Sequence, residues 1–385
     1  MRGSARGPAA YALMALALAG AWIALQAATV HGGRLSGLFW TGSETPLPPG
    51  VLSDTARVSD PRGYDAQYYR LIAHDPLDNR GVQAFLDNPR LRWRRIGVPG
   101  LASIAALGRD AWVEPAYVAI QLAFVFLGAF WSGRLARRFG QSAAWGLAFL
   151  ALPAVLASLE RMTVDLALAA LATGFALYAL EGPSWRLWLV LAAAPLVRET
   201  GLLLVAAWTV YALLKRELGP AAAGALCALP AVVWWAFVAA RTPADGTPWL
   251  SQYPYSGLIQ RSLIGIVPPA SPPGLVIATL LEDAALVGIW AALALAAYIA
   301  WKRRWGHVEI AAVACAAFAA ALGKLDIWDS AFAAARTMTP LLLMLAVIAL
   351  RDRRVVFALP LALVLPRFAF EYLAVVKLML AGKGV

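Results

Sequence analysis

Residues 187–214 read LWLVLAAAPLVRETGLLLVAAWTVYALL, two apolar runs separated by one charged pair. The eleven residues 187–197 would rise only about 16 Å as a helix, roughly half of a bilayer core about 30 Å thick. The tip of such a hairpin, with Arg198 and Glu199, ends inside the membrane. Exposing the two charges to lipid costs roughly 5 to 7 kcal/mol, more than the few Leu and Val residues return. The sequence therefore predicts that the tip pairs internally or lines a polar cavity.

The chain as a whole has the composition of an integral membrane protein. Hydrophobic residues make up 61% of its 385 residues and charged residues 14%, against roughly 25% charged in soluble domains, which excludes a water-soluble fold. The other candidate spans are 9–30, 111–131, 141–159, 163–181, 220–240, 276–300, 308–323, 337–350 and 355–374. With the hairpin arms, 187–197 and 200–214, they predict an all-α, polytopic helical membrane protein of about eleven transmembrane segments, folded as one integral membrane domain over 1–385.

The net charge of +11 comes from short basic clusters between the predicted spans, which is not the single basic face that nucleic acid requires. If the spans alternate, these basic residues share one side: Arg2, Arg6, Arg134, Arg137, Arg138, Arg186, Lys215, Arg216, Lys302, Arg303, Arg304, Arg351, Arg353 and Arg354. The positive-inside rule places that side and the N-terminus in the cytoplasm, so that 31–110 and 241–275 face outward. We favour an uncleaved first span over a cleaved signal peptide, since 9–30 is long enough to cross. Cys227 and Cys315 lack metal-ligand spacing and are interpreted as packing residues.

The outward segment 31–110 contains the stretch YDAQYYRLIAHDP, which starts at Tyr64. Because Pro76 disfavours the α conformation in the residue before it, a short helix is predicted to end at Asp75. Asp65 and Asp75 would then lie about 15 Å apart along the axis, too far for a catalytic carboxylate pair.

On this short helix, Asp65 shares one face with Tyr69 and Ile72, whereas His74 lies on the opposite face. Farther along, RLRWRRIGVPGL places basic residues at the outer membrane surface: Arg92, Arg94 and Arg95.

Polar residues near the outer ends of several spans complete one outward-facing set. The set comprises Asp65, Arg94, Arg95, Glu160, Arg161, Asp165, Arg198, Glu199 and Arg336, together with the loop 241–275. A potential base among several cations suits a reaction in which a hydroxyl loses a proton while an anionic phosphate leaves.

With these features the chain resembles the GT-C superfamily of integral membrane glycosyltransferases, which use lipid-phosphate-linked sugars. The resemblance rests on a first span followed by a long external loop with YDAQYY and HDP, then RWRRIGVPGL, TVDLALAAL, RETGLLL and ARTMTPLL. It is closest to the bacterial branch that builds cell-surface glycopolymers and to polyprenyl-phosphate-mannose-dependent mannosyltransferases. Typical relatives have a Gly within the first motif and an Arg before the Asp-Pro, where this chain has Ala66 and His74, a departure that weakens the subfamily assignment more than the superfamily one.

The resemblance implies an inverting transfer of a hexose or pentose from a polyprenyl-phosphate donor to an extracytoplasmic glycolipid or glycan acceptor, on the periplasmic face of a bacterial inner membrane. Asp65 would be the catalytic base, assisted by Asp165 or Glu160. The expected donor-phosphate contacts are Arg94, Arg95, Arg198, Arg261 and Arg336, and the expected substrate contacts are Tyr64, Gln67, Tyr69, Glu199 and Trp249. A divalent cation, Mg²⁺ or Mn²⁺, at Asp65 is also compatible with the resemblance.

Plainer interpretations stay open beside these. They are an N-cap role for Asp65, helix-dipole stabilisation of Asp165, headgroup anchoring by Arg94 and Arg95, a structural ion pair of Arg198 with Glu199, and an interfacial role for Trp249. Two other functions also stay open. A transporter or flippase of lipid-linked sugars would use the same cavity, although the single short hairpin has no inverted counterpart. The other is a non-catalytic subunit of glycopolymer assembly.

Overall fold

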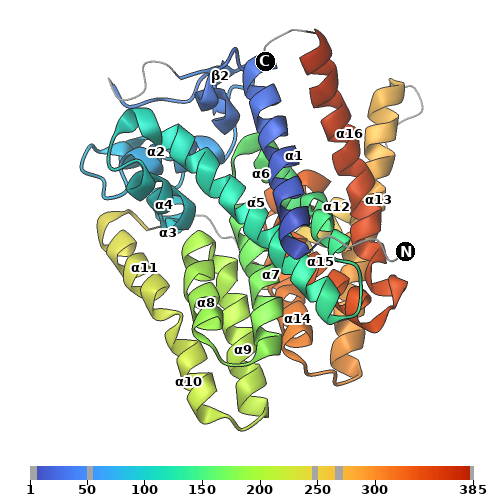
Figure 1. Ribbon diagram of the computed structural model, residues 1–385. Coiled ribbons are helices and arrows are strands. Elements are labelled where there is room, and N and C mark those ends of the chain that lie inside the picture. Colours follow the sequence, from blue (N-terminus) through green and yellow to red (C-terminus); the bar gives the residue numbers. More distant parts are fainter. Residues whose placement is uncertain (1–6, 50–54, 245–249, 265–271, 382–385) are drawn as a thin grey trace.

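The computed structural model describes residues 7–49, 55–244, 250–264 and 272–381, in which the chain forms a helical bundle (Figure 1). The segments 31–110 and 241–275, which the sequence predicts to face outward, are called here the first and second external loops, and the first folds over one end of the bundle (Figure 1). The bundle helices are α1 (Pro8–Thr29), α5 (Val113–Arg138), α6 (Pro153–Arg161), α7 (Asp165–Glu181), α8 (Trp185–Val197), α9 (Leu202–Leu214), α10 (Leu218–Leu226), α11 (Leu229–Arg241), α13 (Pro273–Trp301), α14 (His307–Ala321), α15 (Ala331–Asp352) and α16 (Leu359–Ala381). The short helix α12 (Ser256–Ser262) lies in the second external loop.

Helix occupies every stretch that the sequence predicted as a span, including both arms of the hairpin, α8 and α9. Among the described helices, six are long and apolar enough to cross a membrane. A seventh crossing results if the 3-10 helix η4 (Ala143–Ala151) and α6 form one broken span, bent by 60°. The bend falls at Pro153, which has no N–H to continue the helical hydrogen bonds. A polytopic helical membrane protein is therefore confirmed, whereas eleven crossings stay a prediction, because α7, α8, α9 and α14 are shorter.

Helix α7 lies at the centre of the bundle, where it packs against α5, α6, α8 and α15. Every residue from Asp165 to Ala179 is buried. Small residues permit this close approach: a Cβ on Gly174 would lie 2.9 Å from the ring of Trp131. The central position of α7 brings its first residue, Asp165, into the protein interior.

The first external loop is a small folded unit on the bundle. Its elements are η1 (Leu35–Phe39), β1 (Thr41–Gly42), β2 (Arg57–Val58), α2 (Ala66–His74), η2 (Val82–Phe85), α3 (Pro89–Arg94), α4 (Gly97–Ala105) and η3 (Asp110–Trp112), with β1 and β2 paired in parallel. As predicted, α2 ends just before Asp75 and Pro76. His74 fastens α2 to the start of α5 through Asp110 (Nδ1 to Oδ1, 2.8 Å) and Glu114 (Nε2 to Oε1, 3.2 Å), so it does not pair with Asp65.

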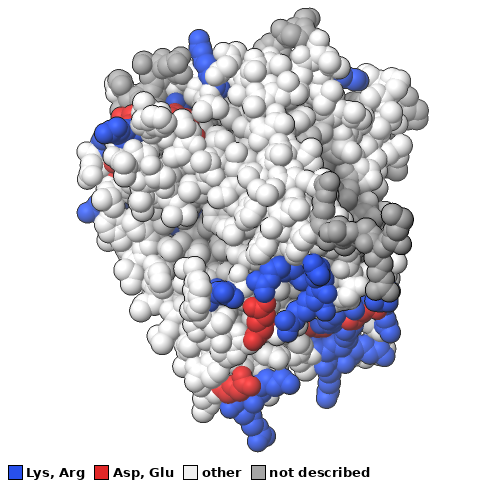
Figure 2. Space-filling model, viewed as in Figure 1, with Lys and Arg blue, Asp and Glu red and all other residues white. Residues whose placement is uncertain are grey.

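The two ends of the bundle differ in charge. At one end, Arg134 near the end of α5 contacts Glu181 at the end of α7 (2.7 Å). At the same end, Arg304, just after α13, contacts Asp352 at the end of α15 (2.6 Å). Figure 2 shows Lys and Arg side chains gathered most densely toward the lower end of the molecule. Asp165, at the first residue of α7, lies at the opposite end of that helix from Glu181. Asp165 and the arginines that contact it therefore lie at the other end of the bundle from these basic residues, as the alternation of spans predicts.

Candidate active site

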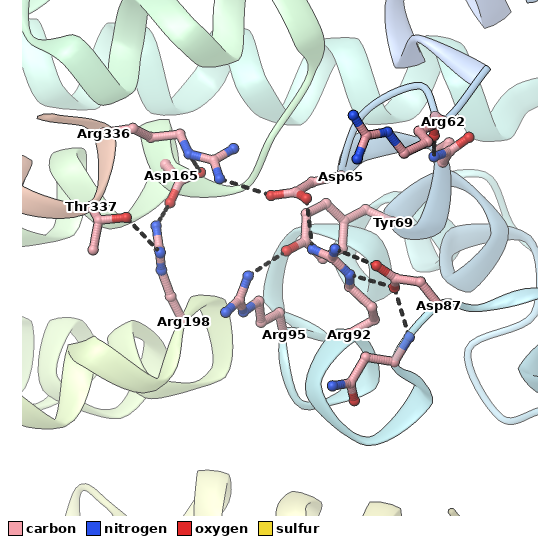
Figure 3. Close-up of polar contacts among 12 residues, drawn as sticks. Arg62, Asp65, Tyr69, Asp87, Arg92, Arg95, Asp165, Arg198, Arg336 and Thr337 are labelled. Carbon is pink, nitrogen blue, oxygen red and sulfur yellow. Dashed lines mark hydrogen bonds and ion pairs between the residues drawn. The ribbon is translucent and has the colours of Figure 1, made fainter. Parts of the chain in front are cut away.

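Asp65 lies between two arginines that come from distant parts of the chain (Figure 3). Its Oδ1 is 2.9 Å from Nη1 of Arg92, in α3, and its Oδ2 accepts a 2.8 Å hydrogen bond from Nη2 of Arg336, in α15. Its side chain is 22% exposed, so the pairing leaves part of the carboxylate accessible. Asp65 occupies the N-cap position of α2, but its side chain makes no capping hydrogen bond, so capping does not account for the carboxylate.

Two glycines set the place at which α2 begins. Gly63 has a φ of +64°, and a Cβ on it would lie 2.4 Å from the Trp40 carbonyl oxygen and from the Gly42 nitrogen. A Cβ on Gly42 would in turn lie 2.4 Å from the carbonyl oxygen of Pro61. Gln67 closes this contact, because its side chain accepts from the Gly42 N–H (3.1 Å) and donates to the Arg62 carbonyl (2.7 Å). The close approach of the Gly42 and Gly63 backbones, which a side chain would prevent, thus fixes the chain two residues before Asp65.

A second carboxylate, Asp165, lies next to Arg336 and Arg198. Arg198 donates a hydrogen bond to Oδ1 of Asp165, and Nε of Arg336 lies 3.5 Å from its Oδ2. Arg198 also donates to the Thr337 hydroxyl at 3.3 Å. Asp165 therefore links two arginines, and one of them also holds Asp65.

The hairpin tip carries a further ion pair. Nε of Arg95 lies 3.1 Å from Oε2 of Glu199, and Nη1 of Arg95 donates a 2.7 Å hydrogen bond to the Tyr69 hydroxyl. With Arg198 on Asp165, both charges of the tip are paired within the protein, as the hairpin sequence predicted. Pairing offsets the cost that these charges would carry in lipid.

These groups surround a cavity of about 910 Å³, called here the arginine cavity. Among the described residues its lining includes six cationic side chains, Arg92, Arg94, Arg95, Arg198, Lys324 and Arg336, and four carboxylates, Asp65, Asp87, Glu199 and Asp326. Apolar side chains also line it: Leu91, Leu250, Phe318, Leu322, Ile327 and Ala333. The cavity therefore combines an excess of positive charge with an apolar wall.

Several arginine donors at the cavity have no hydrogen-bond partner among the described residues. Nη1 of Arg336 and Nε of Arg94 are buried without a hydrogen bond, and Nε of Arg336 also makes none, although it lies 3.5 Å from Oδ2 of Asp165. A buried donor without an acceptor costs about 1 to 3 kcal/mol, so a turn of these side chains toward an anionic ligand in the cavity would recover that energy. Arg94 also stacks on the Trp235 ring, with 5.9 Å from its guanidinium carbon to the ring centre.

A second cavity, of about 560 Å³, is built wholly by the first external loop and is called here the loop cavity. It is lined by Glu44, Thr45, Pro46, Pro61, Arg62, Gly63, Tyr64, Asp65, Gln67, Tyr68, Ala84, Phe85, Leu86, Asp87 and Arg92. Asp65, Asp87 and Arg92 line both cavities. Asp65 therefore lies where the two cavities meet.

The arginines keep Asp65 ionised. Burial by itself favours the neutral acid, but Arg92, Arg336 and Arg95 outweigh it and hold the pKa of Asp65 well below its usual range. An ion pair with charges about 4 Å apart contributes roughly 4 kcal/mol at an effective dielectric constant near 20. In the same way, although burial opposes its charge, Asp65 and Asp87 raise the pKa of Arg92 above its usual value.

The donor set around Asp65 does not fit a divalent cation. Both oxygens of Asp65 face guanidinium groups, and no group of three or more His, Cys, Asp or Glu side chains among the described residues could hold a metal ion. Mg²⁺ and Mn²⁺ prefer clustered oxygen ligands, so arginines take the position that the compatible cation would need.

Several residues predicted for the site lie outside both cavities. Glu160 is fully buried and pairs with Arg161 at 3.1 Å, and Arg261 donates to the Asp329 carbonyl at 3.2 Å. Tyr69 is 1% exposed and contacts Arg95, so it supports an arginine and lacks the access that a substrate contact needs. Trp249 lies outside the described residues.

The other predicted residues line the cavities or lie directly behind them. Arg94, Arg95, Arg198, Glu199 and Arg336 line the arginine cavity, Tyr64 and Gln67 line the loop cavity, Asp65 lines both, and Asp165 lies behind Arg198 and Arg336. Tyr64 packs between Arg161 (4.7 Å to the ring centre) and Arg336 (5.1 Å).

Sequence reasoning missed the partner closest to Asp65 within the loop. Arg92 pairs with Asp65 and is itself gripped by both oxygens of Asp87, at 2.8 and 2.7 Å. The signal was present in RLRWRR, because Arg92 lies three residues before Arg95, a spacing that would place both on one face of a helix. Asp87 gave no such signal, since its role depends on how the loop folds.

Comparison of the chain with protein-family models, with curated proteins and with solved structures finds no match in any of the three. The class that fold and site define is thus a polytopic helical membrane protein with a carboxylate held by arginines between two cavities.

Proposed function

We propose that this protein is a membrane glycosyltransferase that moves a sugar from a polyprenyl-phosphate donor to an extracytoplasmic acceptor with inversion at the anomeric carbon. The observation that carries the proposal is the position of Asp65. Asp65 and Asp87 both line the two cavities, but Asp87 pairs with Arg92, whereas Asp65 bridges Arg92 of the loop and Arg336 of α15. A transferase needs such a junction, because two substrates must meet at one base.

The arginine cavity suits the donor. A lipid-linked sugar phosphate carries an anionic diester next to an apolar chain, and Arg336 and Arg94, whose buried donors lack hydrogen bonds, line this cavity beside an apolar wall. As the glycosidic bond breaks, the leaving polyprenyl phosphate becomes a monoester and gains negative charge. Arginines placed to meet that charge bind the transition state more strongly than the substrate, which is how they accelerate the reaction.

In the chemical step, an acceptor hydroxyl attacks the anomeric carbon from the face opposite the phosphate and loses its proton to Asp65. The new bond joins the acceptor oxygen to the anomeric carbon. The bond from that carbon to the phosphate oxygen breaks, and its electron pair leaves with the polyprenyl phosphate.

A carboxylate held by two arginines is a weak base, so the pairing must loosen before the proton moves. The donor phosphate supplies the means. An arginine that turns from Asp65 toward the phosphate both binds the donor and lets the pKa of Asp65 rise. Arg336 suits this exchange because it lines the arginine cavity and its Nη1 makes no hydrogen bond to the described residues.

For the membrane arrangement, we propose eleven crossings with the N-terminus in the cytoplasm and Asp65 on the outer face. Each expected stretch is helical, and the basic loops lie at the end of the bundle away from Asp165. The recessed tip of α8 and α9 explains how two helices too short for a bilayer are accommodated, because the tip borders the arginine cavity.

The deciding experiment compares polyprenyl phosphate release by the wild type and by Asp65→Asn, with purified protein in detergent and extracted polyprenyl-phosphate sugars. Detergent removes the two compartments that transport requires, so release reports chemistry. The matched control is Asp110→Asn, because Asp110 is a carboxylate of the same loop that pairs with Arg80 at 2.8 Å and lines neither cavity, and Asn keeps an oxygen for the contact with His74.

We expect release by wild type and Asp110→Asn, and a loss of at least about 100-fold in Asp65→Asn, the lower range for general-base catalysis. No release from the wild type with a range of acceptors would favour the transporter or the assembly subunit. Unimpaired release from Asp65→Asn would keep the enzyme and exclude Asp65 as its base.

A further inference from the structure

The two cavities that meet at Asp65 are built from different parts of the protein. Every lining residue of the loop cavity belongs to the first external loop, whereas the arginine cavity adds the hairpin tip and the outer ends of α14 and α15. An apolar lipid chain can follow the apolar wall of the arginine cavity. The loop cavity lies in the part of the chain that faces water, so its occupant is a water-exposed head group.

The charges of the loop cavity nearly cancel. The lining holds three carboxylates and two arginines: Asp87 pairs with Arg92, Asp65 pairs with Arg92 and with Arg336 from outside the lining, and Glu44 and Arg62 are the other ionised side chains. Glu44 and Arg62 are exposed and opposite in sign. An anionic ligand would meet Glu44 and gain little from Arg92, and a cationic one would meet Arg62. The lining therefore favours a neutral occupant.

The remaining side chains have the chemistry that recognises sugars. Tyr68 and Phe85 give the cavity aromatic surface, on which the C–H faces of a sugar ring pack, whereas the Tyr64 ring is covered by Arg161 and Arg336. Burial and the nearby carboxylates raise the pKa of Tyr68, so its hydroxyl stays protonated and can donate a hydrogen bond. The carboxylates of Glu44 and Asp87 accept hydrogen bonds from hydroxyls. A volume of about 560 Å³ lies within the usual range of small-molecule sites.

We propose that the loop cavity is the acceptor site and that it selects a neutral saccharide, whose attacking hydroxyl reaches Asp65 from this side while the donor phosphate lies in the arginine cavity. This inference rests on the transferase proposed above. It adds the class of acceptor and assigns each substrate to one cavity.

The test uses two matched phenylalanines, one in each cavity. Phe85 lines the loop cavity and Phe318 lines the arginine cavity. Full-length protein in lipid nanodiscs is given extracted polyprenyl-phosphate sugars and, as acceptor probe, octyl β-D-glucoside or its anionic counterpart octyl β-D-glucuronide. Release of polyprenyl phosphate is measured while each substrate is varied.

We expect Phe85→Ala to raise the half-saturating concentration of octyl glucoside about tenfold and to leave that of the donor within about twofold. Phe318→Ala should show the opposite split. In the wild type, the neutral glucoside should be used at least about tenfold better than the glucuronide. Misfolding would lower turnover with both substrates, whereas the expected effect is a change in the half-saturating concentration of one substrate. Phe85→Leu provides a milder change with the same expected direction.

The outcomes separate this inference from the function on which it rests. If Phe85→Ala and Phe318→Ala both raise the half-saturating concentration of the same substrate, the assignment of cavities is overturned and the transferase is kept. Preference for the glucuronide would overturn the neutral acceptor alone. No release by the wild type with either probe or with a wider panel of acceptors would overturn both proposals.

Discussion

Arg336 donates a 2.8 Å hydrogen bond to Asp65, although 271 positions separate the two residues in the chain. The same guanidinium lies 3.5 Å from Asp165 through its Nε. One arginine of α15 thus couples a carboxylate of the external loop to a carboxylate at the start of the central helix. Any ligand that draws Arg336 away changes the charge environment of both carboxylates at once.

This coupling predicts a shift in the pH dependence of turnover. Arg336 lowers the pKa of Asp65, and the base must be ionised, so Arg336→Gln should raise that pKa and move the acidic limb of kcat/KM to higher pH. Arg198→Gln is the matched control, because Arg198 lines the same cavity but pairs with Asp165. The measurement is release of polyprenyl phosphate from pH 4 to pH 8. Superimposable acidic limbs for the two variants would show that Asp65 does not govern that limb.

Asp165 is expected to act by positioning arginines. In Asp165→Asn, Arg198 and Arg336 lose a buried counter-charge, which typically costs about 3 to 5 kcal/mol of folding free energy. We expect a lower melting temperature in detergent and a higher half-saturating donor concentration, with a smaller loss of kcat than in Asp65→Asn. A loss of kcat as large as that of Asp65→Asn, without a change in donor dependence, would instead make Asp165 a second catalytic acid.

Chelation should leave turnover almost unchanged. Guanidinium groups occupy both oxygens of Asp65, and the described residues include no cluster of metal ligands. We therefore expect release in excess EDTA to stay within about twofold of the untreated rate, with protein purified without added divalent ions. A loss that Mg²⁺ or Mn²⁺ restores would contradict the assignment of phosphate binding to the arginines.

The proposed orientation predicts which side of the membrane reaches two exposed acidic residues. Glu44 lies in the first external loop and Glu217 lies between α9 and α10. An impermeant maleimide should label Glu44→Cys in right-side-out vesicles and Glu217→Cys only after permeabilisation. Both native cysteines, Cys227 and Cys315, are buried, so the unmodified protein should give little background. The reverse labelling pattern would invert the topology and move Asp65 to the cytoplasm.

Alanine variants of Gly63 and Gly81, which have similar backbone angles, distinguish backbone strain from steric clash. Gly63→Ala and Gly81→Ala both place a Cβ at positive φ, at +64° and +72°, but only the Cβ at Gly63 meets backbone atoms, at 2.4 Å. Gly81→Ala should cost about 1 kcal/mol of stability through its left-handed conformation. Gly63→Ala should cost more and should also impair turnover, since it moves the start of α2 and hence Asp65. Equal melting temperatures for the two variants would contradict the close contact with Gly42.

Much of the fold followed from local patterns. The stretches predicted as spans are all helical, Pro76 marks the end of α2, and the charges of the hairpin tip are paired. Fewer residues of the candidate site could be predicted from the sequence. Asp65, Arg198 and Arg336 could be selected as outward-facing polar residues, but Arg92 and Asp87 were missed, and three expected site residues, Glu160, Tyr69 and Arg261, line neither cavity.

The sequence by itself determined that this chain is a polytopic helical membrane protein with a folded external loop and charges that must be sheltered. Hydropathy and helix periodicity are local properties, and the high cost of placing charge in lipid restricts where each residue can lie. Only the tertiary structure decided which carboxylate meets which arginine, because ion pairs such as Asp65 with Arg336 depend on the approach of helices that are distant in the chain. The same packing decided that Asp65, and not Glu160, lies where the two cavities meet.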